Sequence, residues 1–299
     1  GSFDVAQPML DEHVKTYPKT KGHRRQAALY FQGSNLFRLQ YWTKSAALLD
    51  SFLKEYPEAG SNPYLPFALF DRSNCHFAEE EYTEALEKVT RVETEFPGFG
   101  AMESIFALKG NILENTAQPA EAVAYYEKAL ALAETKENDI VSGEVLLYLV
   151  NILGAEKVDN EDNPDIQKAL PYYDRFWKSY QDSPYRAQVA VTGLPAMRAG
   201  GRIKEGLETL QGVIAELSKI EGTPGLEQAI NSYTESYLEE NTPAELKDHY
   251  YNFPGIDAND AASRALLRIA IIGVYEDKLL TATKEESGAD ISQAQATIK

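Results

Sequence analysis

One short ending recurs three times near the start of the chain. Each copy is an aromatic residue followed by proline, at 17–18, 56–57 and 96–97, so the three prolines lie 39 and 40 residues apart. A fixed period of this length is typical of repeat architectures, in which no single unit can bury its apolar face alone. The chain is therefore expected to fold as a row of similar units that share one extended core.

The residues in front of each proline read as one helix that packs closely on a neighbour. A small residue stands twelve positions before each proline and a larger apolar residue stands eight positions before it. The small residues are Ala6, Ser45 and Ala85, and the larger ones are Leu10, Leu49 and Val89. A small side chain lets two antiparallel helices approach, and a large one a turn later fills the groove beside it. Proline then stops the helix because it lacks the backbone N–H.

These spacings resemble those of the tetratricopeptide repeat family. The first full unit matches the family pattern at Gly33, Trp42, Ser45, Phe52 and Pro57. The next unit matches at Ser73, Tyr82, Ala85, Val92 and Pro97, and the third at Gly110, Ala122, Tyr126 and Ala129. The resemblance implies an all-α fold, a right-handed superhelical solenoid of antiparallel helix pairs (an α-α superhelix).

The match continues with less regularity along the rest of the chain. A fourth pair is expected from a helix at 142–155 and a second helix with Ala169, Tyr173 and Phe176. A fifth is expected from a helix at 185–199, a turn at Gly200–Gly201 and a second helix with Gly206, Leu210 and Val213. Residues 3–217 are thus expected to hold about five tetratricopeptide-like repeats, the first incomplete. Residues 218–299 are expected to form a degenerate repeat and C-terminal capping helices, at 225–239 and 258–280, and residues 1–2 are interpreted as an expression scar.

The aromatic-proline ending and the long period resemble one branch of the family in particular. That branch contains tetratricopeptide proteins of the bacterial envelope, such as the lipoprotein of the outer-membrane barrel-assembly machinery and the Tol-associated periplasmic coordinator. The resemblance implies a periplasmic or envelope-associated protein. Residues 3–18 read as the second helix of a pair whose first helix is missing. This indicates either a fragment of a longer repeat protein or a start after a cleaved signal sequence.

The charge of the chain restricts the classes of partner. The formal net charge is -17. Such a surface repels nucleic acid and anionic membranes, so we expect neither as a direct partner. The sequence has no run of 18 apolar residues, so no transmembrane segment is expected. A neutral or basic protein partner is favoured over an acidic one, although the charge fits a role in solubility alone equally well.

The sequence contains no pattern typical of a catalytic, cofactor or metal site. The four histidines lack metal-ligand spacing, and no serine lies in a nucleophile elbow. Residues 158–165 are rich in oxygen ligands, but Pro164 stands where the common calcium motif has glycine, so a solvated loop is favoured. Cys75 is expected to be a small buried hydrophobe rather than a reactive thiol. We therefore expect a protein that is not an enzyme.

Candidate partner-binding residues lie where the first helices of the family line the concave groove. They are Tyr30, Phe37, Arg38, Phe70, Asn74, Phe77, Asn111 and Asn115. Aromatic and arginine side chains supply contact area together with a polar group, although asparagine after the small residue is common in the family anyway. The lysine position of the family's carboxylate clamp holds Tyr30, Phe70 and Ala107, so binding of a C-terminal carboxylate in that manner is not expected.

These observations predict a scaffold for protein–protein interaction that holds a protein or peptide on the concave face of residues 25–150. The scaffold interpretation predicts that Phe37→Ala together with Phe77→Ala weakens partner binding without unfolding the chain. An alternative is a helical-repeat surface lipoprotein that binds glycans through exposed aromatic side chains. The residues that would favour it are Tyr233, Tyr237, Tyr250 and Tyr251, which could equally pack the irregular C-terminal end.

Overall fold

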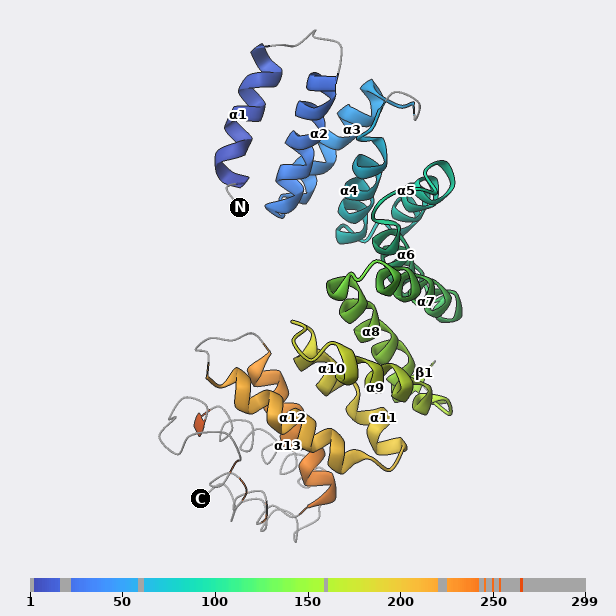
Figure 1. Cartoon of the computed structure of the whole chain (residues 1–299), viewed down its shortest axis with the longest axis vertical. Coiled ribbons are helices and arrows are strands. Elements are labelled where there is room, and N and C mark those ends of the chain that lie inside the picture. The colour runs from blue at the N-terminus through green and yellow to red at the C-terminus, as the bar shows by residue number, and fades with distance from the viewer. Residues whose placement is uncertain are drawn as a thin grey trace, which may run out of the picture. The chain divides into compact units, whose positions relative to one another are not determined.

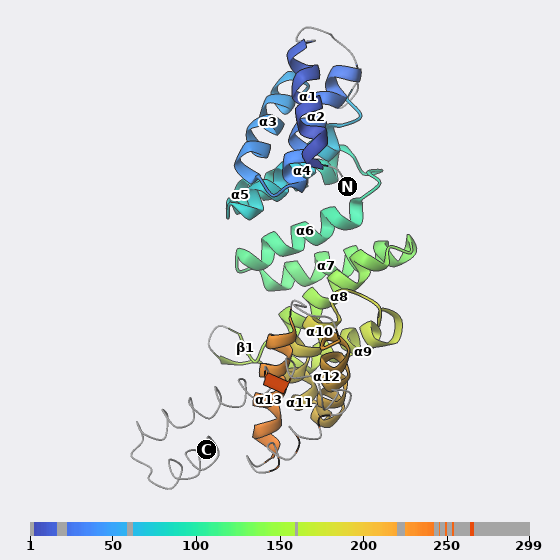
Figure 2. The same ribbon diagram turned by 90° about the vertical axis from the view of Figure 1, so that its left-hand side faces the viewer.

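The fold is helical and consists of two compact units. The computed structural model describes residues 3–16, 23–58, 62–158, 161–219 and 225–241, together with the single residues 245, 249, 253, 264 and 265. Unit 1 comprises Gly1–Val145 and unit 2 comprises Leu146–Lys299. Figures 1 and 2 show the helices in chain order from blue to orange. The prediction of an all-α fold is confirmed at this level.

Consecutive helices of unit 1 pack against one another in the order in which they follow along the chain. They are α1 (Phe3–Thr16), α2 (His23–Arg38), α3 (Trp42–Glu55), α4 (Leu65–Ala78), α5 (Tyr82–Glu95), α6 (Met102–Asn115) and α7 (Pro119–Thr135), and α8 (Asp139–Gly154) follows. In addition α2 packs on α4, and α4 packs on α6. Helices two places apart therefore lie side by side, as they do when helix pairs stack.

The small residues predicted to bring the helices of a pair together do so. A Cβ added at Gly33 would lie 2.7 Å from Cγ of Leu49, and one added at Gly110 would lie 2.4 Å from Cε1 of Tyr126. In two pairs a serine hydroxyl also bonds the backbone of the facing helix. Ser45 Oγ donates to the Gly33 carbonyl and Ser73 Oγ to the Ala85 carbonyl, each at 2.8 Å. Close approach and the added bond fix the register of each pair.

A buried polar contact connects each of three first helices to the second helix of the preceding pair. In each case the donor stands immediately before the small residue of the first helix. The pairs are Gln32 with Asp11, Arg72 with Asp50, and Lys109 with Glu93, at 2.8, 2.8 and 2.6 Å. The three donor residues are buried, whereas Asp11 and Asp50 are exposed and Glu93 is half-buried, so each contact runs from a stacking interface toward the surface. In the contact with Gln32, Asp11 of α1 takes the place that Asp50 of α3 and Glu93 of α5 take in the other two.

The turn between the two helices of a pair has one repeated backbone form. Its central residue is left-handed at Gln40, Glu80 and Ala117, with φ between 57° and 62°, and Glu137, in the turn from α7 to α8 that joins two successive pairs, has the same form with φ 55°. The following N–H reaches back five residues, as in Tyr41 to Leu36 and Gln118 to Leu113, at 3.0 and 2.9 Å. This arrangement satisfies the last carbonyls of the first helix. The predicted turn at Gly200–Gly201 has the same form, with φ +71° at Gly201.

Unit 2 is built from shorter helices and one irregular insertion. After α8 come β1 (Lys157–Val158), β2 (Glu161–Asp162), η2 (Ile166–Ala169), α9 (Leu170–Ser179), α10 (Arg186–Thr192), α11 (Leu194–Ala199), α12 (Ile203–Leu217) and α13 (Leu226–Glu240). The insertion predicted as a solvated loop thus begins with a two-residue antiparallel ladder. Asn163 lies behind it and donates from Nδ2 to the carbonyls of Leu153 and Ala155, at the end of α8.

The single helix predicted over 185–199 is wrong, because the structure has two short helices there. The break falls at Gly193, where an added Cβ would lie 2.3 Å from Cδ2 of Tyr173. Pro195 follows at the start of α11, where its missing N–H costs no helical bond. A continuous helix would require Pro195 to interrupt the hydrogen-bond ladder in its interior. The two short helices keep the Tyr173 ring against the backbone.

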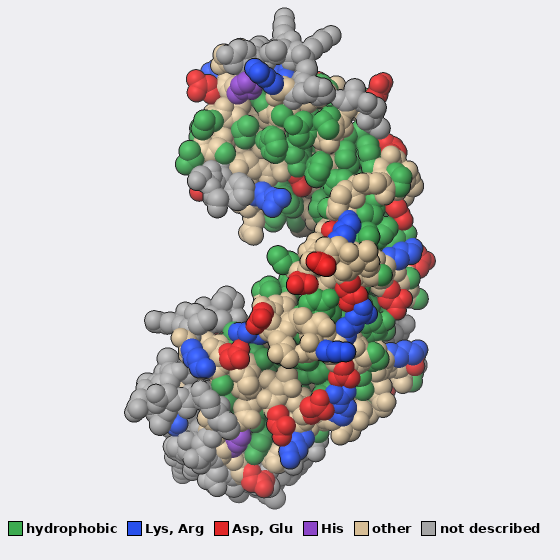
Figure 3. Space-filling model, in the orientation of Figure 1, with side chains coloured by type: hydrophobic (Ala, Val, Ile, Leu, Met, Phe, Trp, Pro, Cys, Tyr) green, Lys and Arg blue, Asp and Glu red, His purple; other side chains and the backbone are tan. Residues whose placement is uncertain are grey.

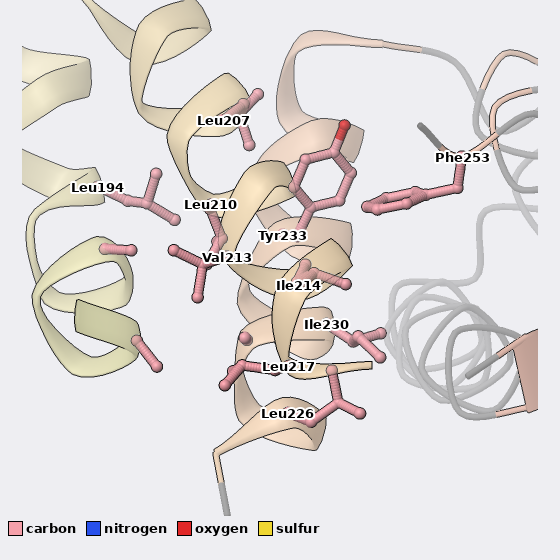
Figure 4. Close-up of a cluster of buried hydrophobic side chains, with 13 residues drawn as sticks. Leu194, Leu207, Leu210, Val213, Ile214, Leu217, Leu226, Ile230, Tyr233 and Phe253 are labelled. Carbon is pink, nitrogen blue, oxygen red and sulfur yellow. The ribbon is translucent and has the colours of Figure 1, made fainter. Parts of the chain in front are cut away.

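The core of unit 2 lies between α10, α11, α12 and α13. Leu210, Ile214 and Ile230 are fully buried there, and Phe253 contributes from a segment beyond α13. Figure 4 shows the ring of Phe253 against that of Tyr233, and the ring centroids are 5.2 Å apart. The helix predicted at 258–280 lies outside the described residues apart from 264 and 265. None of the described helices is long and apolar enough to span a membrane.

Candidate functional site

The surface of unit 1 has an open pocket where α1 lies beside α2. Its volume is about 670 Å³. Helix α1 contributes Ala6, Met9 and Leu10, and helix α2 contributes Tyr30, Phe31, Ser34, Asn35 and Arg38. These positions recur at helical spacing on each helix, so a single face of each lines the pocket. Arg38 is the single charged residue among these lining residues.

Large apolar side chains are exposed around this pocket. Met9 is 68% exposed and Val5 64% on α1, while Phe31 is 45% exposed on α2 and Phe67 43% on α4. In Figure 3 hydrophobic side chains gather over the N-terminal helices of unit 1. Apolar residues scattered singly over a surface need no explanation, but a group rimming a pocket is typical of a binding site.

Aromatic rings join the pocket to the next helix pair. The Phe31 ring lies 5.1 Å from that of Tyr30 and 5.7 Å from that of Tyr64. Beyond them Phe67 contacts Phe99 edge to face at 4.8 Å. The rings hold one another in place, so the exposed apolar surface is preorganised and loses little side-chain entropy on binding.

A buried polar group lies behind the apolar lining. The Tyr30 hydroxyl donates to Oδ2 of Asp71 at 3.1 Å, and both side chains are buried. Burial raises the pKa of the Asp71 carboxyl, while hydrogen bonds from Ser34 and Tyr30 and the charge of Arg38 act in the opposite direction. Burial and the neighbouring Asp71 charge likewise raise the pKa of Tyr30. Tyr30 is therefore a neutral, fixed wall of the pocket.

Two of the eight residues predicted to contact a partner line this pocket. Tyr30 does so with its ring, although its hydroxyl is already bonded, and Arg38 does so as an exposed side chain.

The two predicted phenylalanines occupy packing positions instead. Phe37 contacts Trp42 at 5.3 Å and Phe77 contacts Tyr82 at 5.7 Å, and the two pairs are related by forty residues. Each pair closes the turn of one helix pair, with the phenylalanine half-buried. Truncating either ring to alanine would lower stability as well as remove surface. The double alanine variant is therefore a poor test of partner binding.

The other four predicted residues mainly serve the helix pairs themselves. Phe70 is half-buried and packs against the core, and Asn74 donates to its backbone carbonyl at 2.9 Å. Asn111 accepts a hydrogen bond from the Tyr126 hydroxyl at 2.6 Å. Asn115 donates to the Asn111 carbonyl at 2.8 Å and accepts from the Tyr82 hydroxyl at 3.3 Å. The side-chain amides of the three asparagines are bonded within the fold, and none of these four residues lines the pocket.

Sequence reasoning missed most of the pocket lining. Phe31 is adjacent to the buried Tyr30 and has no property in the sequence that marks it as exposed. Met9 lies between Ala6 and Leu10 in a helix for which the sequence analysis indicated only that its partner helix is missing. The available signal was the apolar spacing Ala6, Met9, Leu10, which exceeds what one neighbouring helix can cover.

The described residues contain no group of three or more histidine, cysteine or acidic side chains placed to hold a metal ion. Cys75 is fully buried, and burial raises the pKa of its thiol to about 11. Its Sγ lies 3.6 Å from Oγ of Ser45. The prediction that Cys75 is a small buried side chain is confirmed.

Of the four aromatic residues considered for glycan binding, Tyr233 and Tyr237 pack against one another and against His249. Tyr233 is 3% exposed, and its ring stacks on Tyr237 at 5.8 Å and on His249 at 5.7 Å. The Tyr233 hydroxyl and Nε2 of His249 are 2.7 Å apart. The Tyr233 ring fills the core between α12 and α13, in agreement with the alternative that these side chains pack the C-terminal end. Tyr250 and Tyr251 lie outside the described residues.

Comparisons with known proteins add no family assignment. No family model matches the chain, and a search of curated proteins found no significant match.

Proposed function

We propose that this chain is a non-enzymatic scaffold that holds a segment of another protein at the pocket between α1 and α2. The observation that carries the proposal is the set of exposed apolar side chains around a preformed pocket in unit 1. An apolar surface in water is costly to leave uncovered, and its burial drives association. The net charge of -17 favours a partner whose surface is neutral or basic outside the contact.

The fold and setting are part of the same proposal. Tightly packed helix pairs, repeated left-handed turns and repeated contacts between pairs support a tetratricopeptide-like right-handed solenoid. A place in the bacterial envelope is supported by the aromatic-proline endings and their spacing of 39 and 40 residues. Glycan binding has less support, because the pocket lining is mainly apolar and Tyr233 is buried.

Substitution of one exposed residue tests the proposed site without disturbing the core. Met9→Asp places a charge in the pocket, and Ile140→Asp is the matched control, since these side chains are 68% and 66% exposed. Ile140 lies in α8, and it is not among the residues that line the pocket. Both variants should keep their helical circular dichroism and melting temperature, because neither substitution opens a cavity.

The readout is capture of proteins from an envelope extract of the source cells, quantified by mass spectrometry. We expect a reproducible protein to be retained by the wild type and by Ile140→Asp, and to be lost with Met9→Asp. Equal retention by both variants would show that the pocket is not the contact site. Retention of polysaccharide in place of protein would favour the glycan alternative.

A further inference from the structure

The chemistry of the bound segment can be read from the lining of the pocket. Phe31, Ser34, Asn35 and Arg38 lie on one face of α2, at the spacing of successive turns. Phe31 and Arg38 are seven residues apart, so about 10 Å separates them along the helix axis. Along this face the lining changes from an exposed aromatic ring to a cation, and apolar residues of α1 lie opposite.

The other polar groups of the lining already have partners within the fold. Asn35 donates from Nδ2 to Oε1 of Gln7 at 2.7 Å. Ser34 and Tyr30 both bond the buried Asp71 carboxylate. These groups gain nothing from a ligand unless an existing bond is broken.

Arg38 differs from them. Its side chain is exposed at the end of α2. Within the part of the chain that the structure describes, no carboxylate lies within 4.0 Å of its guanidinium. Arginine carries five N–H donors in a planar fork that matches a carboxylate. The pocket therefore presents an uncovered apolar surface and one cation that lacks a close ion-pair partner.

We propose that the pocket binds an extended segment in which a bulky apolar side chain and an aspartate or glutamate lie about three residues apart. This inference rests on the proposed function and specifies its ligand. The apolar side chain fills the space between Met9 and Phe31, and the carboxylate pairs with Arg38. An extended chain advances about 3.3–3.6 Å per residue, so three residues span the distance between the two contacts.

The packing of α1 on α2 favours an extended segment over a helix. Side-chain hydrogen bonds from Asn35 to Gln7 and from Gln32 to Asp11 close the space between the two helices. What remains open admits side chains, whereas a bound helix has a diameter of about 10 Å with its side chains. The acidic residue is a local feature of the ligand, because the net charge of -17 repels a segment that is acidic throughout.

Selection from a random peptide library displayed on phage tests this inference with a defined probe. The full chain is the bait, and Met9→Asp is used for counter-selection, so that only pocket-dependent peptides are retained. We expect the retained sequences to share a large apolar residue with an acidic residue about three positions away. A synthetic peptide with the consensus sequence then gives the dissociation constant for each variant.

Charge reversal at the cation separates this inference from the proposed function. Arg38→Glu should weaken the consensus peptide about tenfold or more, as expected for loss of a charge-assisted hydrogen bond. Lys44→Glu is the control, because Lys44 is exposed in α3, makes the same change in net charge, and does not line the pocket.

Each outcome has one meaning. The inference is supported if the retained peptides carry the acidic residue, bind the Lys44→Glu variant as tightly as the wild type, and bind the Arg38→Glu variant more weakly. Peptides that share an apolar residue without an acid, that place the acid two helical turns away, or that bind Arg38→Glu unchanged would overturn it and leave the scaffold proposal standing. Absence of any pocket-dependent peptide would count against both.

Discussion

Gly110 lets the ring of Tyr126 lie directly against α6, and a methyl group at this position would remove that space. The Cβ of an alanine would lie 2.4 Å from Cε1 and 2.5 Å from Cδ1 of the ring. The ring cannot easily move, because Tyr126 is fully buried and its hydroxyl lies 2.6 Å from both Asn111 and Glu114. Gly110→Ala is therefore predicted to destabilise unit 1.

The magnitude follows from opposing contributions. Alanine in place of glycine inside a helix gains about 1 kcal/mol of helix propensity. Overpacking a well-filled core costs about 1–3 kcal/mol, and each hydrogen bond lost from the displaced hydroxyl costs about 1 kcal/mol more. We expect a net loss of about 1–3 kcal/mol in the free energy of unfolding.

The two tryptophans allow the free energy of unfolding of unit 1 to be measured separately from that of unit 2. Trp42 lies in unit 1 and Trp177 in unit 2, so Trp177→Phe leaves Trp42 as the sole fluorescent reporter of unit 1. Urea unfolding of Gly110→Ala is compared in this background with its parent. Gly212→Ala, measured through Trp177 in a Trp42→Phe background, is the control. Gly212 is helical with no neighbour within 4 Å of an added Cβ, so alanine should stabilise unit 2 by about 1 kcal/mol.

The reasoning would be refuted if Gly110→Ala stabilised unit 1 as Gly212→Ala stabilises unit 2. A double-mutant cycle adds a sharper criterion. Tyr126→Leu should cost less in the Gly110→Ala background than in the wild type, because a smaller side chain relieves the overlap. Additive effects of the two substitutions would show that the close approach has no energetic role.

Two further predictions concern a turn and a titrating group. Ala117→Gly should stabilise unit 1 by about 1 kcal/mol, because Ala117 has φ 57° and glycine adopts the left-handed region without strain. Ala124→Gly, inside α7, is the control and should destabilise unit 1 by about 1 kcal/mol. Urea unfolding measures both changes in the free energy of unfolding. Burial lowers the pKa of His249 below 6.5, so the unfolded chain binds the proton first and stability falls as the pH drops below about 6.5. His249→Gln should reduce that slope by up to about 1.4 kcal/mol per pH unit, and an unchanged slope in denaturation series from pH 7 to 5 would contradict the assignment.

The helix pairs were predictable because their signals are local. Gly33, Ser45 and Pro57 set the approach, register and end of a pair through properties that each residue carries by itself. The turns were harder, since the left-handed positions hold Gln40 and Glu80 where glycine is the usual marker.

The pocket could not be predicted in the same way. Tyr30 and Phe31 are neighbours in the sequence, yet one is a buried wall and the other a half-exposed ring, and only the packing of α1 and α4 on α2 decides this. Phe37 and Phe77 lie outside the pocket lining and pack at the turns of their helix pairs. Phe37 contacts Trp42 and Phe77 contacts Tyr82, each five residues further along the chain, because the turn brings the two rings together. A repeated aromatic pair at that spacing would have indicated packing.

The buried contacts between successive helix pairs also bear on how a chain of similar units finds its correct neighbours. Each stacking interface uses a different donor, an amide at Gln32, a guanidinium at Arg72 and an ammonium at Lys109. Repeat proteins characteristically misassemble when one unit docks on the wrong copy. If α6 docked on α3 in place of α5, Lys109 would meet Leu53 at the height where Glu93 lies, forty residues later in the sequence. A buried ammonium without its carboxylate is strongly unfavourable, so the differences between these contacts select the native order of the helices.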